Sequence, residues 1–102
     1  MVKIIQGTTP TIQYDFHVVS VSDISVAVLT FKQGGNIVIE KSLQDAIVGA
    51  DSLSWKLTQE ESLGLAVGKG NVMCNWLLLD GTRGASEDET LLVLSNHKRE
   101  VI

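Results

Sequence analysis

Residues 70–94, GNVMCNWLLLDGTRGASEDETLLVL, contain the pattern that decides the fold of this chain. Two apolar runs flank a short turn with Asp80-Gly81, and Asp-Gly between strand-like runs is a strong short-range signal for a β-hairpin. Both runs alternate at a period of two, which places one set of side chains on the inward face. The inward set is Val72, Cys74, Trp76, Leu91 and Val93. The stretch therefore predicts the central hairpin of an all-β domain.

Several other stretches predict strands by their composition or alternation. The clearest is residues 11–19, where Ile12, Tyr14, Phe16 and Val18 share one face, and residues 52–57 place Trp55 on the inward face. The expected strands span residues 2–5 (an edge strand or arm), 11–19, 24–32, 37–41 and 52–57, and residues 43–49 form a loop or a short extra strand. Glycines 34 and 35 predict the turn of a second hairpin.

A short helix is expected just before the central hairpin. Thr58 and Glu61 stand three residues apart, as in a capping box, where each side chain satisfies a free backbone amide of the first turn. Six or seven strands with turn signals about every ten residues are typical of a Greek-key sandwich. We therefore expect one domain, residues 1–102: an immunoglobulin-like β-sandwich with one short helix before the penultimate strand. The Cys…Trp…Cys pattern of antibody domains is absent, and a small open barrel is the alternative.

Size and charge restrict the functional classes. The chain has 102 residues, a formal net charge of −4 and a sequence pI of about 4.9, so it lacks the clustered cations that bind phosphate backbones. No apolar run reaches the roughly 18 residues that span a bilayer. The first ten residues lack the features of a signal peptide. We expect a protein that is cytosolic when made, with no nucleic-acid or membrane partner.

The residue types that carry catalysis are scarce. His17 lies on the outward phase of a strand, His97 lies in a polar tail, and the single Cys74 is expected to be a small buried apolar residue. This set supplies neither a nucleophile with its base nor a zinc site. Acidic residues do cluster at Asp80 and residues 87–89, which suggests a calcium site, but charges at this position more often protect a sheet edge. We expect no enzyme, no cofactor and no metal.

Surplus apolar residues on the second face of the hairpin are more informative. A solvated sheet face is usually polar, whereas here the outward phase carries large apolar side chains. Either another layer of the chain covers them or a partner does, because contiguous apolar patches mark interaction sites. The candidate interface residues are Met73, Leu77, Leu79, Leu92 and Leu94.

Four short motifs carry a family resemblance: residues 5–11 (IQGTTPT), 57–63 (LTQEESL), 75–76 (NW) and 80–86 (DGTRGAS). Together they resemble small proteins encoded in phages and prophages of gut Firmicutes. They are also distantly similar to the N-terminal β-sandwich domain of phage baseplate upper proteins. The resemblance spans nearly the whole chain and names no catalytic residue. Baseplate upper proteins continue into assembly and receptor-proximal regions, so we expect a small accessory or adaptor subunit.

These observations lead to a functional hypothesis with two alternatives. The first hypothesis is a non-enzymatic phage structural or accessory protein associated with the tail or baseplate. It is made in the bacterial host cytoplasm, contacts other phage structural proteins or a second copy of itself, and enters the virion. The alternative is a small ligand- or carbohydrate-binding module, although Trp55 and Trp76 both fall on inward phases. A host-modulating phage protein is the third reading.

Overall fold

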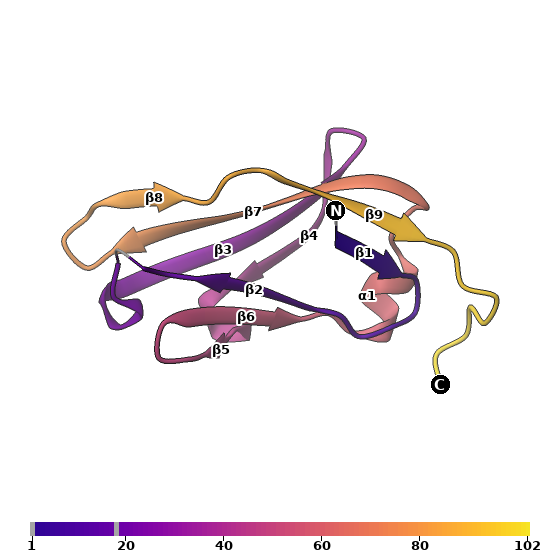
Figure 1. Ribbon diagram of the computed structural model, residues 1–102, viewed down its shortest axis with the longest axis horizontal. Helices are drawn as coiled ribbons and strands as arrows, with labels where there is room; N and C mark the ends of the chain where they lie inside the picture. Colours follow the sequence, from indigo (N-terminus) through magenta and orange to yellow (C-terminus); the bar gives the residue numbers. More distant parts are fainter. Residues whose placement is uncertain (1, 18) are drawn as a thin grey trace.

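The computed structural model describes residues 2–17 and 19–102, and its strands form two sheets that face each other (Figure 1). Sheet A has the strand order β1-β9-β7-β3-β4, with β8 also paired to β7, and sheet B has the order β2-β6-β5. The strands are β1 (Val2–Ile5), β2 (Thr11–Asp15), β3 (Ile24–Gln33), β4 (Asn36–Ser42), β5 (Ile47–Val48), β6 (Ser52–Lys56), β7 (Gly68–Leu78), β8 (Arg83–Ala85) and β9 (Glu89–Leu94). This arrangement is a two-sheet sandwich rather than an open barrel.

The predicted hairpin at Asp80-Gly81 is confirmed. The amide of Gly81 donates to the carbonyl of Leu78 at 3.0 Å, and the amide of Thr82 donates to Asp80 Oδ1 at 2.8 Å. Gly81 adopts a φ of +89°, a left-handed conformation that a residue without a Cβ accepts at little cost. β7 then lies at the centre of sheet A, between β3 and the returning strands.

The return arm of this hairpin is divided, which the alternation of residues 91–94 did not predict. β8 pairs with the end of β7 at Leu77, whereas β9 pairs with its beginning, and residues 86–88 bulge between them. At the break the amide of Cys74 donates to Ser86 Oγ at 2.8 Å. A side-chain oxygen thus replaces a strand carbonyl, and the ladder is interrupted without an unpaired amide at Cys74.

The strand predicted at residues 11–19 is too long, because β2 ends at Asp15. Among the described residues β2 pairs with β6 alone, and β6 begins at Ser52, which pairs with Asp15, so these residues offer no further ladder pairs beyond that point. Phe16 adds one last backbone bond, from its amide to the carbonyl of Asp51 at 2.7 Å. Tyr14 and Phe16 are buried as expected, and the predicted inward position of Val18 lies outside the described residues.

The remaining connections are short. Gly34-Gly35 joins β3 to β4 as predicted, and β1 pairs in parallel with β9 at the edge of sheet A. A 3-10 turn at Val21–Asp23 precedes β3. The ambiguous stretch 43–49 contains both a 3-10 turn (Leu43–Asp45) and the two-residue strand β5.

The helix α1 (Gln59–Leu63) links sheet B to sheet A and confirms the predicted capping box. The Glu61 amide donates to Thr58 Oγ1 at 3.1 Å, and the Thr58 amide donates to Glu61 Oε1 at 2.9 Å. Lys41 of β4 reaches the same carboxylate at 2.9 Å, so this cap also attaches α1 to the edge of sheet A. Among the described residues, no helix is long and apolar enough to cross a membrane.

The core between the sheets is built around two aromatic pairs. Trp55 is fully buried, packs edge-on against Tyr14 with ring centroids 6.3 Å apart, and donates from Nε1 to the carbonyl of Ser42 at 2.9 Å. Trp76 packs edge-on against Phe16 at 5.1 Å. Alternating residues of β3, β7 and β9 complete this layer, so their intervening side chains point away from sheet B.

Candidate outer-face binding site

The candidate site is the outer face of sheet A, the face that points away from sheet B. Because Leu29, Cys74 and their neighbours at period two are buried, the alternate residues of β3 and β7 must point outward. The register pairs these outward residues across the two central strands. The pairs are Val26 with Leu77, Val28 with Asn75, Thr30 with Met73, and Lys32 with Asn71.

A polar hollow of about 460 Å³ occupies the middle of this face. Its floor is formed by outward side chains of β3 and β7, and one wall is the Gly34-Gly35 turn, which has no side chains. Asp88, from the bulge between β8 and β9, lies at the other wall. The lining residues are Thr30, Lys32, Gly34, Gly35, Asn71, Met73, Asn75 and Asp88.

Two hydrogen bonds orient the asparagines of the hollow. Asn71 Nδ2 donates to Asp88 Oδ2 at 3.3 Å, and Arg83 Nη2 donates to Asn75 Oδ1 at 3.3 Å. No other described side chain bonds these amides, so Asn71 Oδ1 is available as an acceptor and Asn75 Nδ2 as a donor. The two asparagines therefore offer an acceptor and a donor to the hollow from outward positions four residues apart on β7.

A second, more apolar hollow of about 270 Å³ lies beside the first, and Asn75 lines both. Its lining includes Val26, Val28 and Leu77, together with Trp76 and Arg83. Val26 is 47% exposed and Leu77 37% exposed, which are high values for apolar side chains on paired strands. Leu79, in the following turn, is 71% exposed. This end of the face offers apolar surface to a partner.

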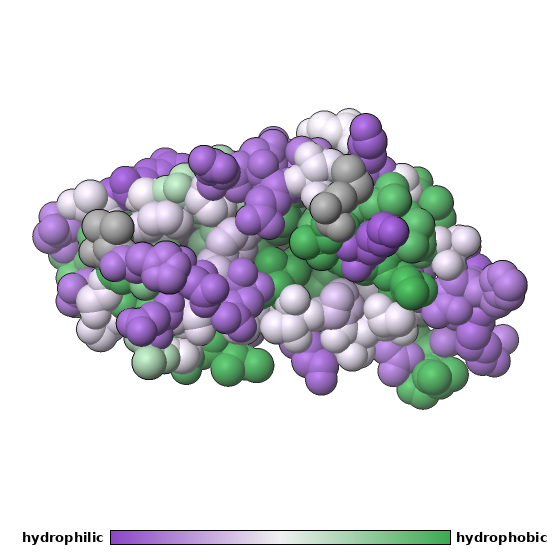
Figure 2. Space-filling model, viewed as in Figure 1, coloured by the Kyte–Doolittle hydropathy of each residue, from purple (hydrophilic) through white to green (hydrophobic). Residues whose placement is uncertain are grey.

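The other apolar end lies at the edge formed by β1 and β9. Leu92 and Leu94 are half-buried, and the register places exposed Ile5 beside Leu94. Lys3 and Lys69 pair with Leu92 from both sides, so cations flank this end. Figure 2 shows hydrophobic atoms gathered where β1 and the end of β9 lie, with hydrophilic atoms among them.

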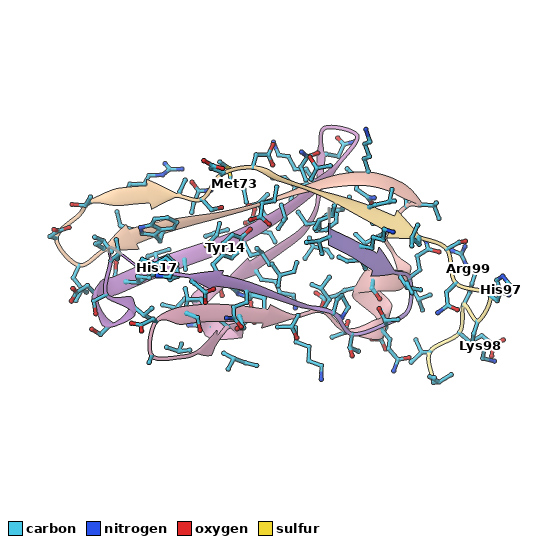
Figure 3. All side chains as sticks on the ribbon, in the orientation of Figure 1. Tyr14, His17, Met73, His97, Lys98 and Arg99 are labelled. Atoms are coloured by element: carbon cyan, nitrogen blue, oxygen red, sulfur yellow. The ribbon has the colours of Figure 1, made fainter. Side chains whose placement is uncertain are left out.

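The structure thus places the five predicted interface residues at three places on the outer face rather than in one patch. Leu77 and Leu79 lie at the hairpin end, and Leu92 and Leu94 at the β1 edge. Met73 lies between them on the floor of the polar hollow (Figure 3). Asn71 and Asn75 separate Met73 from both apolar ends along β7.

Charge on the outer face differs in sign from that of the whole chain. Among the described residues of the paired strands, four cations point outward, Lys3, Lys32, Lys69 and Arg83, against Glu40, and Asp88 adds a carboxylate at the polar hollow. Asp23 and Asp80 lie beside Leu79 in the hairpin turn. The chain as a whole carries −4. Neither Lys32 nor Arg83 forms an ion pair among the described residues. The face therefore favours an anionic partner.

The residues considered for catalysis or metal binding do not come together. His17 and His97 are exposed and lie at opposite ends of the long axis (Figure 3). Cys74 is buried, and burial raises the pKa of its thiol to about 11, as expected for an inert core cysteine. The hydrogen bond from the Thr82 amide lowers the pKa of Asp80, which is engaged in its own turn. Residues 2–17 and 19–102 contain no group of three metal-binding side chains.

Sequence reasoning missed the polar residues of the site. Lys32, Asn71, Asn75 and Arg83 are all in the outward phase of strands that the pattern identified or flanked. Their phase was therefore available as a signal. The sequence does not show that these side chains lie together, because that depends on the register between β3 and β7 and on the position of the bulge at residues 86–88.

Comparisons with known proteins bear on the fold. No family model matches the sequence, and no curated protein matches it. A crystal structure of a strand-swapped dimer of the immunoglobulin-like domain of mouse leukocyte-associated immunoglobulin-like receptor 1 is 16% identical, covers 91% of this chain and 86% of that chain, and gives a TM-score of 0.51. The V domain of amphioxus IgVJ-C2 is 15% identical, with coverages of 90% and 98% and a TM-score of 0.38. This chain is a mostly β, two-sheet immunoglobulin-like sandwich with one short helix before its last strands.

Proposed function

We propose that this protein is a non-enzymatic structural or accessory subunit of a phage particle, associated with the tail or baseplate, that acts through protein–protein contacts. The observation that carries the proposal is the outer face of sheet A, where Val26, Leu77 and Leu79 are exposed apolar side chains on a face that is normally polar. The resemblance of residues 5–11, 57–63 and 80–86 to phage and prophage proteins supports the particle context.

The size of the face suits such a contact. Five strands spaced about 4.8 Å apart and the 11 residues of β7 give a surface of roughly 20 Å by 37 Å, on the order of 700 Å². A standard protein–protein interface buries about 800 Å² on each partner. The outer face of sheet A is therefore large enough to hold one specific partner.

The carbohydrate-binding alternative has less support. Sugar sites usually place an aromatic ring flat on the surface, whereas Trp55 is fully buried and Trp76, which is half-buried beside the apolar hollow, packs edge-on against Phe16. Tryptophan fluorescence separates the two ideas: emission that is readily quenched by acrylamide would indicate an exposed ring and favour the sugar-binding module.

The experiment for the proposed function is light scattering on a sizing column over a wide range of protein concentration. The protein is run alone and then mixed with each tail or baseplate protein encoded beside its gene. We expect a discrete oligomer or a stable complex with one of these proteins. A monomer at every concentration that forms no complex with any of them contradicts the proposal.

A further inference from the structure

We propose that the two neighbouring hollows on the outer face of sheet A, which share Asn75, bind an extended, acidic segment of a partner polypeptide. This inference deepens the proposed function and rests on it, because it names what the partner presents. Four observations support it: the shape of the site, the spacing of its amides, its apolar end and its charge.

The shape is that of a channel along the strands. The polar and apolar hollows share Asn75 and together extend from Asn71 to Leu77 on β7. The six steps along the strand from Asn71 to Leu77 span roughly 20 Å, so an extended segment of about seven residues fits along the channel.

The spacing of the two asparagines matches a polypeptide backbone. Asn71 and Asn75 are four residues apart on one face of β7, a distance of roughly 13 Å. Peptide groups four residues apart in an extended segment repeat at the same distance. Because Asn71 offers an acceptor and Asn75 a donor, the pair can accept from one backbone amide of the segment and donate to one of its carbonyls.

The apolar hollow then takes a side chain of the segment. Val26, Val28 and Leu77 line its floor and remain partly exposed on this face. Side chains of an extended segment alternate, so one apolar residue that points toward the sheet fills this hollow. Burial of that side chain supplies apolar contact that the polar hollow lacks.

Charge determines which segment is preferred. Arg83 lies at the apolar end and Lys32 at the polar end, and neither is paired with a carboxylate among the described residues. Both can pair with Asp or Glu side chains of the segment. The excess of cations on this face of an acidic chain also attracts an acidic segment over a distance.

The test is a selection on the purified full chain from a random dodecapeptide library, followed by affinity measurements on the selected peptides at low and physiological ionic strength. We expect enrichment of peptides that combine Asp or Glu with an apolar residue, and affinity that falls with salt. Chemical shifts measured by NMR should change at β3, β7 and residues 83–88, and little on sheet B.

Three charge-reversal variants test where on the protein the selected peptides bind. Lys32→Glu and Arg83→Glu should each weaken the binding of the selected peptides at least tenfold. Lys56→Glu, at another exposed lysine but on the outer face of sheet B, should leave the affinity unchanged. All three side chains are solvent-exposed, and unchanged unfolding midpoints verify that the variants are folded.

Three outcomes overturn the inference. These are no enriched peptide, a preference for basic or uncharged peptides, or equal affinity of all three variants. Each of these outcomes leaves the proposed function intact if the sizing experiment finds an oligomer or a complex. The outer face would then bind a folded protein surface instead of an extended segment. The opposite result is also possible: the peptides bind as expected, but the protein stays a monomer in every mixture of the sizing experiment. That result supports the peptide site and contradicts the proposed binding to phage structural proteins.

Discussion

The Tyr14 hydroxyl is buried between the sheets and makes no hydrogen bond of normal geometry among the described residues, although Ser86 is close enough to oppose the rise that burial causes in its pKa. Removing an unpaired buried polar atom releases its desolvation penalty, so we expect Tyr14→Phe to leave the free energy of unfolding unchanged or to raise it by up to about 1 kcal/mol. Urea unfolding monitored by tryptophan fluorescence measures this. Trp55→Phe is the matched comparison: it loses the bond to Ser42 and core volume, and should cost roughly 2 kcal/mol.

Because the Tyr14 hydroxyl is buried, we also expect the protein to lose stability at alkaline pH. Burial raises the pKa of Tyr14 from 10.0 to about 12. Between these values the folded protein keeps a proton that the unfolded chain has released, so this group makes stability fall as pH rises from about 10 to about 12. Unfolding midpoints over this range should fall less steeply for Tyr14→Phe than for the wild type. Equal slopes would contradict the assignment.

The Trp76 ring leaves no space for a side chain at residue 84, so this position requires glycine. A Cβ at residue 84 would lie 2.5 Å from Trp76 Cε2, and the ring is held on its other side by Phe16. We expect Gly84→Ala to displace the ring and to destabilise the fold by roughly 1–3 kcal/mol, with a shift of tryptophan emission. Ala85→Ser, at the adjacent exposed position, should change neither the unfolding midpoint nor the emission.

At the level of elements, Glu61 caps α1 and connects it to β4 of sheet A. Burial raises the pKa of its carboxyl, but hydrogen bonds from Lys41 and Thr58 outweigh burial, so the pKa lies below its usual 4.5. The stabilisation is therefore present above pH 4.5 and is lost as pH falls through the lower pKa of the folded state. We expect Glu61→Ala to cost about 1 kcal/mol at neutral pH and progressively less in acid.

Glu60 provides the control for this prediction. It is an exposed carboxylate in the same helical turn with no ion pair among the described residues, so Glu60→Ala should have a small effect at every pH. Denaturant midpoints for the wild type and both variants as a function of pH make the comparison. A constant difference between wild type and Glu61→Ala down to strong acid would show that the carboxylate charge is not what stabilises the cap.

The elements that sequence predicted are those with local causes. Asp80-Gly81 forms its turn through bonds among adjacent residues, and Thr58 caps α1 through a residue three positions away. The end of β2 at Asp15 was missed because it depends on where β6 begins, about 40 residues later. The channel was missed for the same reason: Lys32 and Asn71 meet only through the register of β3 and β7.

At the level of the whole molecule, two exposed apolar surfaces compete as interfaces. The outer face of sheet A presents Leu77 beside a net positive charge, whereas the short strand β5 on the edge of sheet B presents Ile47, 63% exposed, and Val48. β5 has only two residues and offers few ladder bonds to a partner. The larger area and the defined charge of the outer face favour it as the binding surface.

This preference can be tested with two lysine substitutions. If the protein forms an oligomer or a complex, Leu77→Lys should reduce its affinity at least tenfold, because it places a charge in the apolar hollow, while Ile47→Lys should leave the affinity unchanged. Both positions are exposed, so both variants should keep the unfolding midpoint of the wild type. Dissociation by Ile47→Lys alone would instead assign the interface to the β5 edge. The β5 edge has neither the channel nor the cations Lys32 and Arg83. The selected peptides would then be the remaining support for the peptide-binding inference.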